Sequence, residues 1–266
     1  MPDDWQHALE VAERAALEAG ALIMEGFRLS ARVSRKGRFD LVTEFDLASE
    51  RLIRERIEAA FPEHRIVGEE GEATGEGEMV WYIDPIDGTV NFAHGHPYFG
   101  ISIGLYREAE GLVGVVHAPA LGNTWKAAKG AGAFRDGHRC VVSERSTLDE
   151  ALCTTGFPGN VANTRDTNEA ELALFLRHAR GVRRCGSAAL DLALVGDGTF
   201  DVYWERALKP WDICAGALIV SEAGGTLSSY DGSPADPRSG ALVATNGVLH
   251  ESVLKLIREA RRKIPG

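Results

Sequence analysis

The stretch WYIDPIDGTVNF, Trp81 to Phe92, joins an apolar run to a segment that holds two aspartates, a proline and a glycine. Residues 80–83 predict a buried strand, because the apolar run ends abruptly in turn formers and carboxylates. Ligands in α/β proteins gather beyond the carboxyl ends of strands. We therefore expect Asp84 and Asp87 to face one small volume. The ordinary alternative for such a pair is a solvated Asp-Gly turn.

The composition describes a globular chain that carries excess negative charge. It has 266 residues, of which 44% are hydrophobic, enough for one large domain or two modest ones. The net charge of -10 argues against direct binding of nucleic acid or an anionic membrane, and so favours a small-molecule partner. The four cysteines are far apart and show no zinc or disulfide spacing, and the first residues are acidic rather than basic. We expect a cytoplasmic protein.

Two different patterns divide the chain near residue 142. Apolar residues recur at helical spacing from 5 to 27, and a second helix is expected over 47–61 with Asp46 as its N-cap residue. Alternating apolar residues after residue 99 predict antiparallel hairpins. Beyond residue 143 strands and helices alternate. We predict an N-terminal α+β subdomain over 1–142 and a C-terminal α/β subdomain over 143–266.

Further acidic residues stand at the ends of predicted elements. Glu69 and Glu70 follow the short strand RIVG, Glu205 ends the strand DVYWE, and Asp212 opens the helix WDICAGALIVSEAGG. Each has a simpler explanation when taken alone: a Glu-Glu pair is commonly a solvated charge run, and an aspartate at a helix start commonly caps it. Asp46 has the same two interpretations.

Taken together, these carboxylates predict a cation site with oxygen ligands. Magnesium, manganese and calcium use such sites, and the spacing in DPIDGT does not match a calcium loop. Backbone amides near Gly88 and Thr89 could bind an anion at the start of a helix. The combination of cations and amides on one phosphoryl group favours phosphate chemistry with a metal-activated water.

The chain resembles the inositol monophosphatase family of magnesium-dependent, lithium-sensitive phosphatases. The resemblance covers nearly the whole chain, and the motifs DLVTEFD, FPEHRIVGEE, WYIDPIDGTVNF, HPYFGISIGL, GSAALDLALV and WDICAGALIVSEAGG occur in the family's order. It implies a layered αβαβα sandwich of the sugar-phosphatase type. In that fold an antiparallel first half packs on a mixed α/β second half, the site lies between them, and the protein is a homodimer.

The resemblance also implies roles for individual residues. The implied ligands of two or three Mg²⁺ ions, with Mn²⁺ as a substitute, are Glu69, Asp84, the carbonyl of Ile86, Asp87 and Asp212. Thr89 and Asp46 would form the pair that orients the attacking water, helped by Glu69, with Glu70 supporting Glu69 from behind. Lys36 would reach a third metal through water.

Substrate contacts are implied on both sides of the site. The implied set is Gly88 and Thr89 for phosphate, with Arg183, Gly186, Ser187, Ala188, Glu205 and Asp212 around the rest of the substrate. For Arg183 a position at the surface or in a dimer interface is an alternative.

The expected reaction is hydrolysis of a small phosphorylated polyol, with myo-inositol 1-phosphate as the first choice. Fructose 1,6-bisphosphate, NADP and 3′-phosphoadenosine nucleotides are alternative substrates on the same scaffold. A second class of function is a non-catalytic protein partner in transcription or RNA processing. A third, a metal-binding module without turnover, is disfavoured because holding cations requires neither Thr89 nor Asp46.

Overall fold

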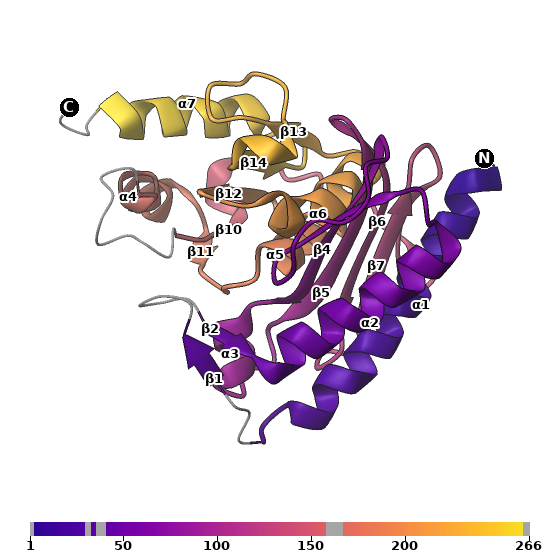
Figure 1. The fold of residues 1–266 in the computed structure, drawn as a ribbon. Helices are drawn as coiled ribbons and strands as arrows, with labels where there is room; N and C mark the ends of the chain where they lie inside the picture. Colours follow the sequence, from indigo (N-terminus) through magenta and orange to yellow (C-terminus); the bar gives the residue numbers. More distant parts are fainter. Residues whose placement is uncertain (1–2, 30–32, 36–40, 158–166, 263–266) are drawn as a thin grey trace.

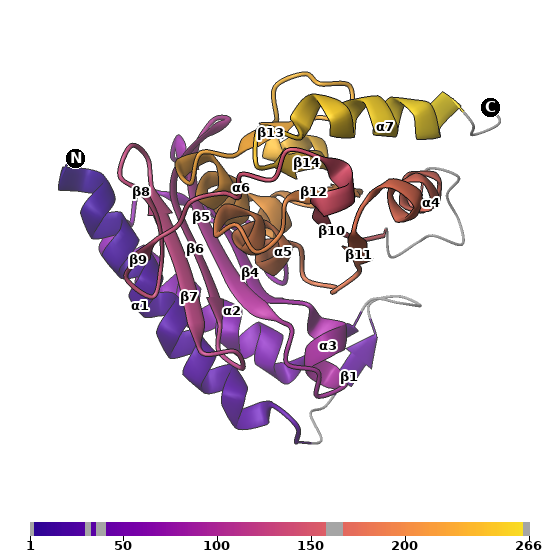
Figure 2. The same cartoon turned by 180° about the vertical axis from the view of Figure 1, so that it is seen from behind.

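The computed structural model describes residues 3–29, 33–35, 41–157 and 167–262. Its elements form a layered αβαβα sandwich with two mixed sheets (Figures 1 and 2), which confirms the expected fold class. Lys36, the predicted contact to a third metal, lies outside the described residues. Among the described residues, no helix combines the length and apolar character needed to cross a bilayer.

The seven-stranded sheet is built from the first half of the chain. Its spatial order follows the sequence order, and its strands are β3 (Arg65–Gly68), β4 (Met79–Asp87), β5 (Gly100–Arg107), β6 (Glu110–Ala118), β7 (Asn123–Ala128), β8 (Gly132–Arg135) and β9 (His138–Arg139). All pairs are antiparallel except β3 with β4, which run parallel. The predicted hairpins are therefore confirmed, with one parallel pair at the edge that brings two strand ends together.

The five-stranded sheet comes from the second half. Its order is β11 (Gly181–Arg183), β10 (Leu152–Thr155), β12 (Val202–Arg206), β14 (Ala241–Thr245) and β13 (Thr226–Ser228). β10 pairs in parallel with both neighbours, and β14 pairs antiparallel with β12 and β13. A separate two-stranded antiparallel ribbon joins β1 (Val33–Arg35) to β2 (Leu41–Thr43).

Helices cover both faces of both sheets. The outer layers are α1 (Asp3–Gly26) with α2 (Glu44–Ala60) on the seven-stranded sheet, and α4 (Glu169–His178) with α7 (His250–Arg262) on the five-stranded sheet. The middle layer is α5 (Ala188–Gly196) with α6 (Pro210–Glu222). Shorter pieces are α3 (Thr89–Ala93) and two 3₁₀ turns, Leu148–Glu150 and Pro237–Ser239.

The sequence pattern of each helix explains its layer. α5 has eight buried residues among its nine, all of them small or apolar except Asp191, as expected for a helix enclosed between two sheets. α1 instead presents one buried stripe of small residues, Ala8, Ala12, Ala15, Ala16 and Ala19. Small side chains let a helix approach its neighbour closely, and separate apolar clusters then fill the spaces between successive layers.

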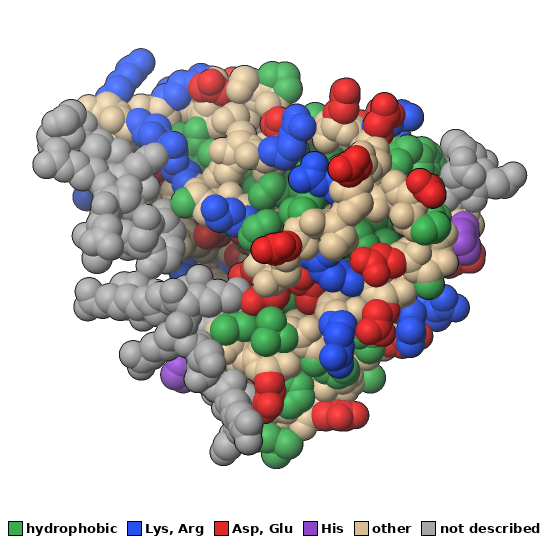
Figure 3. Space-filling model, in the orientation of Figure 1, with side chains coloured by type: hydrophobic (Ala, Val, Ile, Leu, Met, Phe, Trp, Pro, Cys, Tyr) green, Lys and Arg blue, Asp and Glu red, His purple; other side chains and the backbone are tan. Residues whose placement is uncertain are grey.

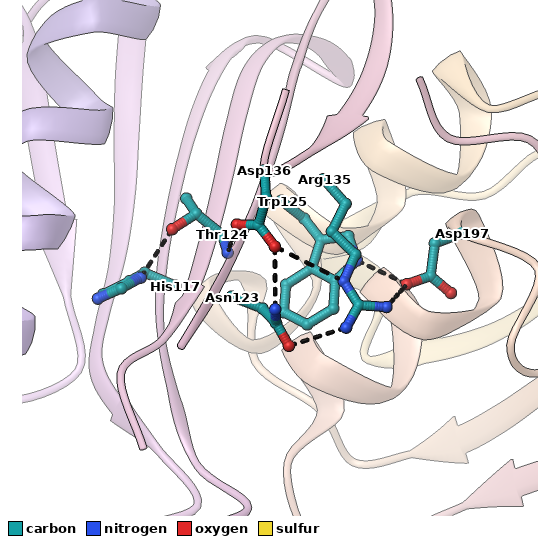
Figure 4. Close-up of polar contacts among 7 residues, drawn as sticks. All are labelled: His117, Asn123, Thr124, Trp125, Arg135, Asp136 and Asp197. Carbon is teal, nitrogen blue, oxygen red and sulfur yellow. Dashed lines mark hydrogen bonds and ion pairs between the residues drawn. The ribbon is translucent and has the colours of Figure 1, made fainter. Parts of the chain in front are cut away.

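A polar network fixes the middle helix layer to the seven-stranded sheet (Figure 4). Asp197 follows the last residue of α5, and its Oδ2 accepts hydrogen bonds from Trp125 Nε1 and Arg135 Nη1, both at 2.9 Å. Arg135 Nη2 also donates to Asn123 Oδ1 at 2.8 Å. This contact anchors the carboxyl end of α5 and thereby the orientation of its amino end.

Two predicted boundaries near the acidic residues were wrong. Helix α2 begins at Glu44 with Thr43 as its N-cap residue, so Asp46 is the third residue of the helix and not its cap. Strand β4 continues past Ile83 to Asp87, with an irregular register between Asp84 and Asp87. The helix start is set locally, by a capping box in which Thr43 and Asp46 bond to each other. The strand is extended by pairing with β5, where Asp87 lies opposite Gly100.

Candidate active site

A polar pocket lies where the two halves of the chain meet. It is lined by Glu69, Asp84, Ile86, Asp87, Gly88, Thr89, Gly156, Arg184, Gly186, Ser187, Ala188, Glu205, Leu208 and Asp212. Acidic side chains gather near the middle of the face seen in Figure 3. Eleven of the sequence-predicted site residues are in this set, so residues from strand ends far apart in sequence do converge on one volume.

The parallel pairing of β3 and β4 brings the first acidic loop to the second. Gly68 pairs with Ile83, and the amide of Glu69 donates to the carbonyl of Ile83 at 3.2 Å. Because parallel strands end at the same edge of a sheet, Glu69 emerges next to Asp84. Glu70 is not among the pocket residues; its amide donates instead to the carboxylate of Glu50, which belongs to α2.

The DPIDGT segment is held by its own backbone and by a left-handed glycine. Asp84 is 2% exposed, and its Oδ1 accepts a hydrogen bond from the amide of Ile86 at 3.1 Å. Gly88 has φ +96°, and a Cβ there would lie 3.1 Å from the carbonyl oxygen of Gly186. A side chain would be strained at this φ and crowded by that carbonyl, so glycine lets the turn pack directly against the other half of the chain.

Asp87 is oriented by the amino end of α5. Its Oδ2 accepts from Ser187 Oγ and from the amide of Ala189, both at 2.6 Å. Ser187 is 2% exposed. The hydroxyl that the family resemblance assigns to the substrate therefore donates to a carboxylate of the protein, and the other oxygen of Asp87 is left for a further partner.

Thr89 and Asp46 form a pair across the two N-terminal segments. Thr89 Oγ1 lies 3.1 Å from Asp46 Oδ1 and 3.0 Å from the carbonyl oxygen of Ile86. Asp46 Oδ2 accepts from both the amide and the hydroxyl of Thr43. Asp46 itself is fully buried and does not line the pocket, so it acts on the site through Thr89.

Asp212 reaches the pocket from the first turn of α6. It is the third residue of that helix, and its Oδ2 accepts from the amide of Lys209 at 2.7 Å. One carboxylate oxygen therefore satisfies the helix end, as the cap interpretation predicts, while the side chain also lines the pocket; the role of Asp212 as a metal ligand stays a prediction.

The acidic groups disturb one another's titration. Burial raises the pKa of Asp84 well above its ordinary value, and the neighbouring charges of Glu69, Asp87 and Asp212 raise it further. Burial also raises the pKa of Asp87 to about 6, against the hydrogen bonds from Ser187 and Ala189 that lower it. For Asp212, burial and then the charge of Asp87 raise the pKa to about 8. The charge of Lys209 lowers the pKa of Asp212, but burial and the neighbouring acids outweigh it.

The donor set fits hard divalent cations. Buried carboxylates that repel one another become favourable when a cation lies between them, and oxygen-only donors suit Mg²⁺ and Mn²⁺. Within the described residues, no three His, Cys, Asp or Glu side chains form a preassembled metal centre. The fit therefore rests on the chemistry and burial of four of the five acidic residues that line the pocket, Glu69, Asp84, Asp87 and Asp212.

On the C-terminal side of the pocket lies one more acidic side chain, Glu205, whose partner is a tyrosine. Tyr203 Oη donates to Glu205 Oε2 at 2.9 Å, and burial raises the pKa of Glu205 to about 8.

Asn91 Nδ2 from α3 donates to the carbonyl oxygens of Tyr98 and Cys185, at 2.6 and 2.9 Å. This amide joins the turn after DPIDGT to the turn before α5.

Sequence reasoning missed three pocket residues and chose the wrong member of an arginine pair for the pocket wall. Arg183 does not line the pocket, and its Nη1 donates to the carbonyl oxygen of Val182 at 3.3 Å, whereas Arg184 does line it. Gly156 could have been found, because it directly follows strand β10, as Glu69 directly follows β3. Leu208 gives no sequence signal, and local pattern does not decide between adjacent arginines.

Comparisons with known proteins agree with this geometry. The model of the inositol monophosphatase family matches residues 4–262. An inositol-1-monophosphatase from Synechocystis is 42% identical over 95% of this chain and 89% of its own length. A fructose-1,6-bisphosphatase/inositol-1-monophosphatase from Thermotoga maritima is 38% identical over 97% of this chain and 98% of its own. A Nus factor SuhB from Pseudomonas aeruginosa is 41% identical over 95% and 96%.

A solved structure of the same family has a similar fold. The structure of an inositol monophosphatase from Anabaena (Nostoc) superposes with a TM-score of 0.88 at 39% identity, covering 98% of both chains.

Proposed function

The chain belongs to the inositol monophosphatase family, a family of phosphatases, and on this premise we propose that it is a magnesium-dependent phosphomonoesterase that hydrolyses myo-inositol 1-phosphate. The observation that carries the proposal is the convergence of two features. Five acidic residues line one pocket, and Thr89, which contacts the buried Asp46, lines the same pocket. A site built only to hold cations needs the first feature and not the second.

Five groups are proposed to hold the metals: the carboxylates of Glu69, Asp84, Asp87 and Asp212 and the carbonyl of Ile86. Two or three Mg²⁺ ions, or Mn²⁺ in their place, would neutralise phosphate charge and make a water acidic enough to react. Asp84 is the most deeply buried of the four, so its charge would be stabilised most by a bound cation. Lithium sensitivity is part of the proposal at the level of the family.

The protein's own part in the reaction is to orient water and phosphate. Thr89 Oγ1 would accept a hydrogen bond from the attacking water while it donates its own hydrogen bond to Asp46 Oδ1, and the contacts of Thr43 with Asp46 hold that carboxylate in place. The amides of Gly88 and Thr89, two pocket residues, donate to the phosphate oxygens. Positioning of this kind supplies much of the barrier reduction in phosphoryl transfer.

The polyol is assigned to the C-terminal side of the pocket. Gly186, Ala188 and Glu205 line it, and Glu205 can exchange hydrogen bonds with a hydroxyl because Tyr203 fixes only one of its oxygens. Ser187 is proposed to orient Asp87 and not to bind substrate, because its hydroxyl donates to the Asp87 carboxylate. Asp212 is proposed to contact both a metal and the substrate.

Phosphate release tests the proposal directly. Purified protein would be assayed with myo-inositol 1-phosphate in Mg²⁺, in EDTA, and in Mg²⁺ with lithium. We expect release that requires Mg²⁺ and is inhibited by lithium. Folded protein that releases no phosphate from this or any other monoester would contradict the proposal.

Fructose 1,6-bisphosphate is the second candidate substrate. Arg184 is the one cationic residue among the described residues that line the pocket, and it offers a partner for a second phosphate. The Thermotoga maritima relative carries both activities in its name. A kcat/KM for the bisphosphate about tenfold above that for the monophosphate, roughly 1.4 kcal/mol in transition-state binding, would reverse our order.

A non-catalytic role is the remaining class, favoured by the relative named as a Nus factor. The net charge of -10 disfavours direct contact with RNA, so such a role would act through a protein partner. Complementation of a deletion in the native host by Asp84→Asn would separate the two, because that variant lacks a central pocket carboxylate. We also propose a homodimer, and a cytoplasmic location in line with four free thiols.

A further inference from the structure

Helix α2 presents three polar side chains to the two acidic loops. Asp46, Ser49 and Glu50 are all buried and lie at helical spacing on one face. Asp46 contacts Thr89, and Ser49 Oγ donates to the carbonyl oxygen of Pro85 at 3.1 Å. Asp46 is buried because it belongs to the proposed water-orienting pair, but that pair does not explain why the charged side chain of Glu50 is also buried.

The carboxylate of Glu50 closes the turn that carries Glu69. Its Oε2 accepts from the amide of Glu70 at 2.7 Å, and its Oε1 accepts from the amide of Gly71 at 2.9 Å. Glu50 is 2% exposed. A carboxylate that binds two successive amides fixes the backbone of the turn, and hydrogen bonds to a charged acceptor are stronger than neutral ones.

Arg54 holds that carboxylate in its orientation. Its Nε donates to Glu50 Oε1 at 2.8 Å, and its two terminal nitrogens lie 3.3 Å from Thr74 Oγ1 and 3.4 Å from the carbonyl oxygen of Gly71. The ion pair is largely buried, with the side chains of Arg54 and Glu50 13% and 3% exposed. Salt therefore screens it weakly.

The glycines of the GEEG segment are explained by the same carboxylate. A Cβ at Gly68 would lie 2.4 Å from Glu50 Cδ, and one at Gly71 would lie 2.8 Å from Oε1. Neither distance is compatible with a side chain unless Glu50 moves. The turn thus leaves room for Glu50 on both sides of Glu69 and Glu70.

We propose that Glu50 is a positioning residue that presents the Glu69 carboxylate to the pocket through the backbone of the Glu69–Gly71 turn, and so sets the affinity for the divalent cation. The inference rests on the proposed function, because it assigns Glu69 to metal. Glu50 touches neither the pocket nor the substrate site. Its loss is therefore expected to weaken cation binding and to leave the substrate KM at saturating Mg²⁺ within about twofold.

Three variants test the inference. Glu50→Gln keeps the shape but loses the charge and one acceptor. Glu55→Gln is the matched control, since Glu55 forms an exposed pair with Arg51 on the same helix. Ile57→Val, at a fully buried position of α2, controls for a general loss of stability. For Glu50→Gln we expect the Mg²⁺ concentration at half-saturation, from calorimetry and from activity, to rise about tenfold or more.

Hydrogen exchange supplies a readout that needs no turnover. In metal-free protein the amides of Glu70 and Gly71 should exchange about tenfold faster in Glu50→Gln than in either control. Unchanged half-saturation, or a rise equal to that of Ile57→Val, would overturn the proposal, as would unchanged exchange at both amides.

If Glu50→Gln does not fold, Arg54→Met takes its place, because it leaves both amide contacts and removes the group that orients them. We expect about a threefold rise in Mg²⁺ half-saturation, and no rise would count against the proposal. A wild-type chain that releases no phosphate would refute the proposed function, while exchange and calorimetry would still decide the role of Glu50.

Discussion

Thr89 Oγ1 lies 3.1 Å from Asp46 Oδ1, although the two residues are 43 positions apart in the sequence. The other oxygen of Asp46 is occupied by Thr43, so Oδ1 is the atom that faces Thr89. The geometry separates two kinds of carboxylate: the proposed metal ligands line the pocket, and Asp46 lies behind them in contact with a hydroxyl.

Removal of the Thr89 hydroxyl should abolish turnover while cation binding persists. We expect Thr89→Ala to lower kcat by about 10²- to 10⁴-fold, the range for loss of a group that positions or activates a nucleophile. Calorimetric Mg²⁺ binding should remain. Because the pair acts as a unit, Thr89→Ala combined with Asp46→Asn should cost little more than either alone. Val90→Ala, at an exposed neighbouring position, is the control.

Ser187→Ala distinguishes two roles for one hydroxyl. Since Ser187 Oγ donates to Asp87 Oδ2 at 2.6 Å, its removal should weaken Mg²⁺ binding about tenfold and leave the substrate KM nearly unchanged at saturating Mg²⁺. The opposite result, a higher KM with normal Mg²⁺ binding, would show that the hydroxyl contacts substrate. Ser233→Ala removes a surface hydroxyl that contacts Asp231 and serves as the control.

The adjacent arginines offer a matched pair for substrate choice. Arg184→Ala should raise the KM for fructose 1,6-bisphosphate by up to about tenfold relative to myo-inositol 1-phosphate, because only the bisphosphate has a second charge for it to bind. Arg183→Ala should leave the ratio unchanged. Equal effects of the two substitutions on the ratio would contradict the assignment.

Stability without metal should depend on pH with a definite sign. Burial raises the pKa of Asp212 to about 8 and that of Asp87 to about 6, both above the unfolded value near 4. The folded state therefore binds more protons than the unfolded state, and the stabilisation is lost as pH rises through the folded pKa values.

In EDTA we expect the Tm to fall as the pH rises from 6.5 to 8. The free energy of unfolding should decrease by up to about 1.4 kcal/mol per pH unit for each extra proton that the folded state binds. Mg²⁺ should remove most of this slope, because the cation replaces the protons on the pocket carboxylates. Asp212→Asn should flatten the slope measured in EDTA. A Tm that rises over this interval in EDTA would show that the pocket acids are ionised without metal.

Local pattern was enough to identify the elements that carry the site. The apolar run before Asp84, the largely apolar sequence of α5 and the proline and aspartate at the start of α6 each reflect short-range constraints on the backbone. The seam near residue 142 between the two predicted subdomains stays a prediction.

What the sequence by itself determined was which residue types stand at element ends, and from their order the family and its chemistry. What only the tertiary structure decided was the partner of each side chain: Ser187 on Asp87, Arg184 rather than Arg183 at the pocket, and Glu50 behind the Glu69 turn. Periodicity fixes which face of an element is buried, because burial repeats with the helix or strand. Partners are chosen by contacts between segments tens of residues apart, and these leave no local pattern.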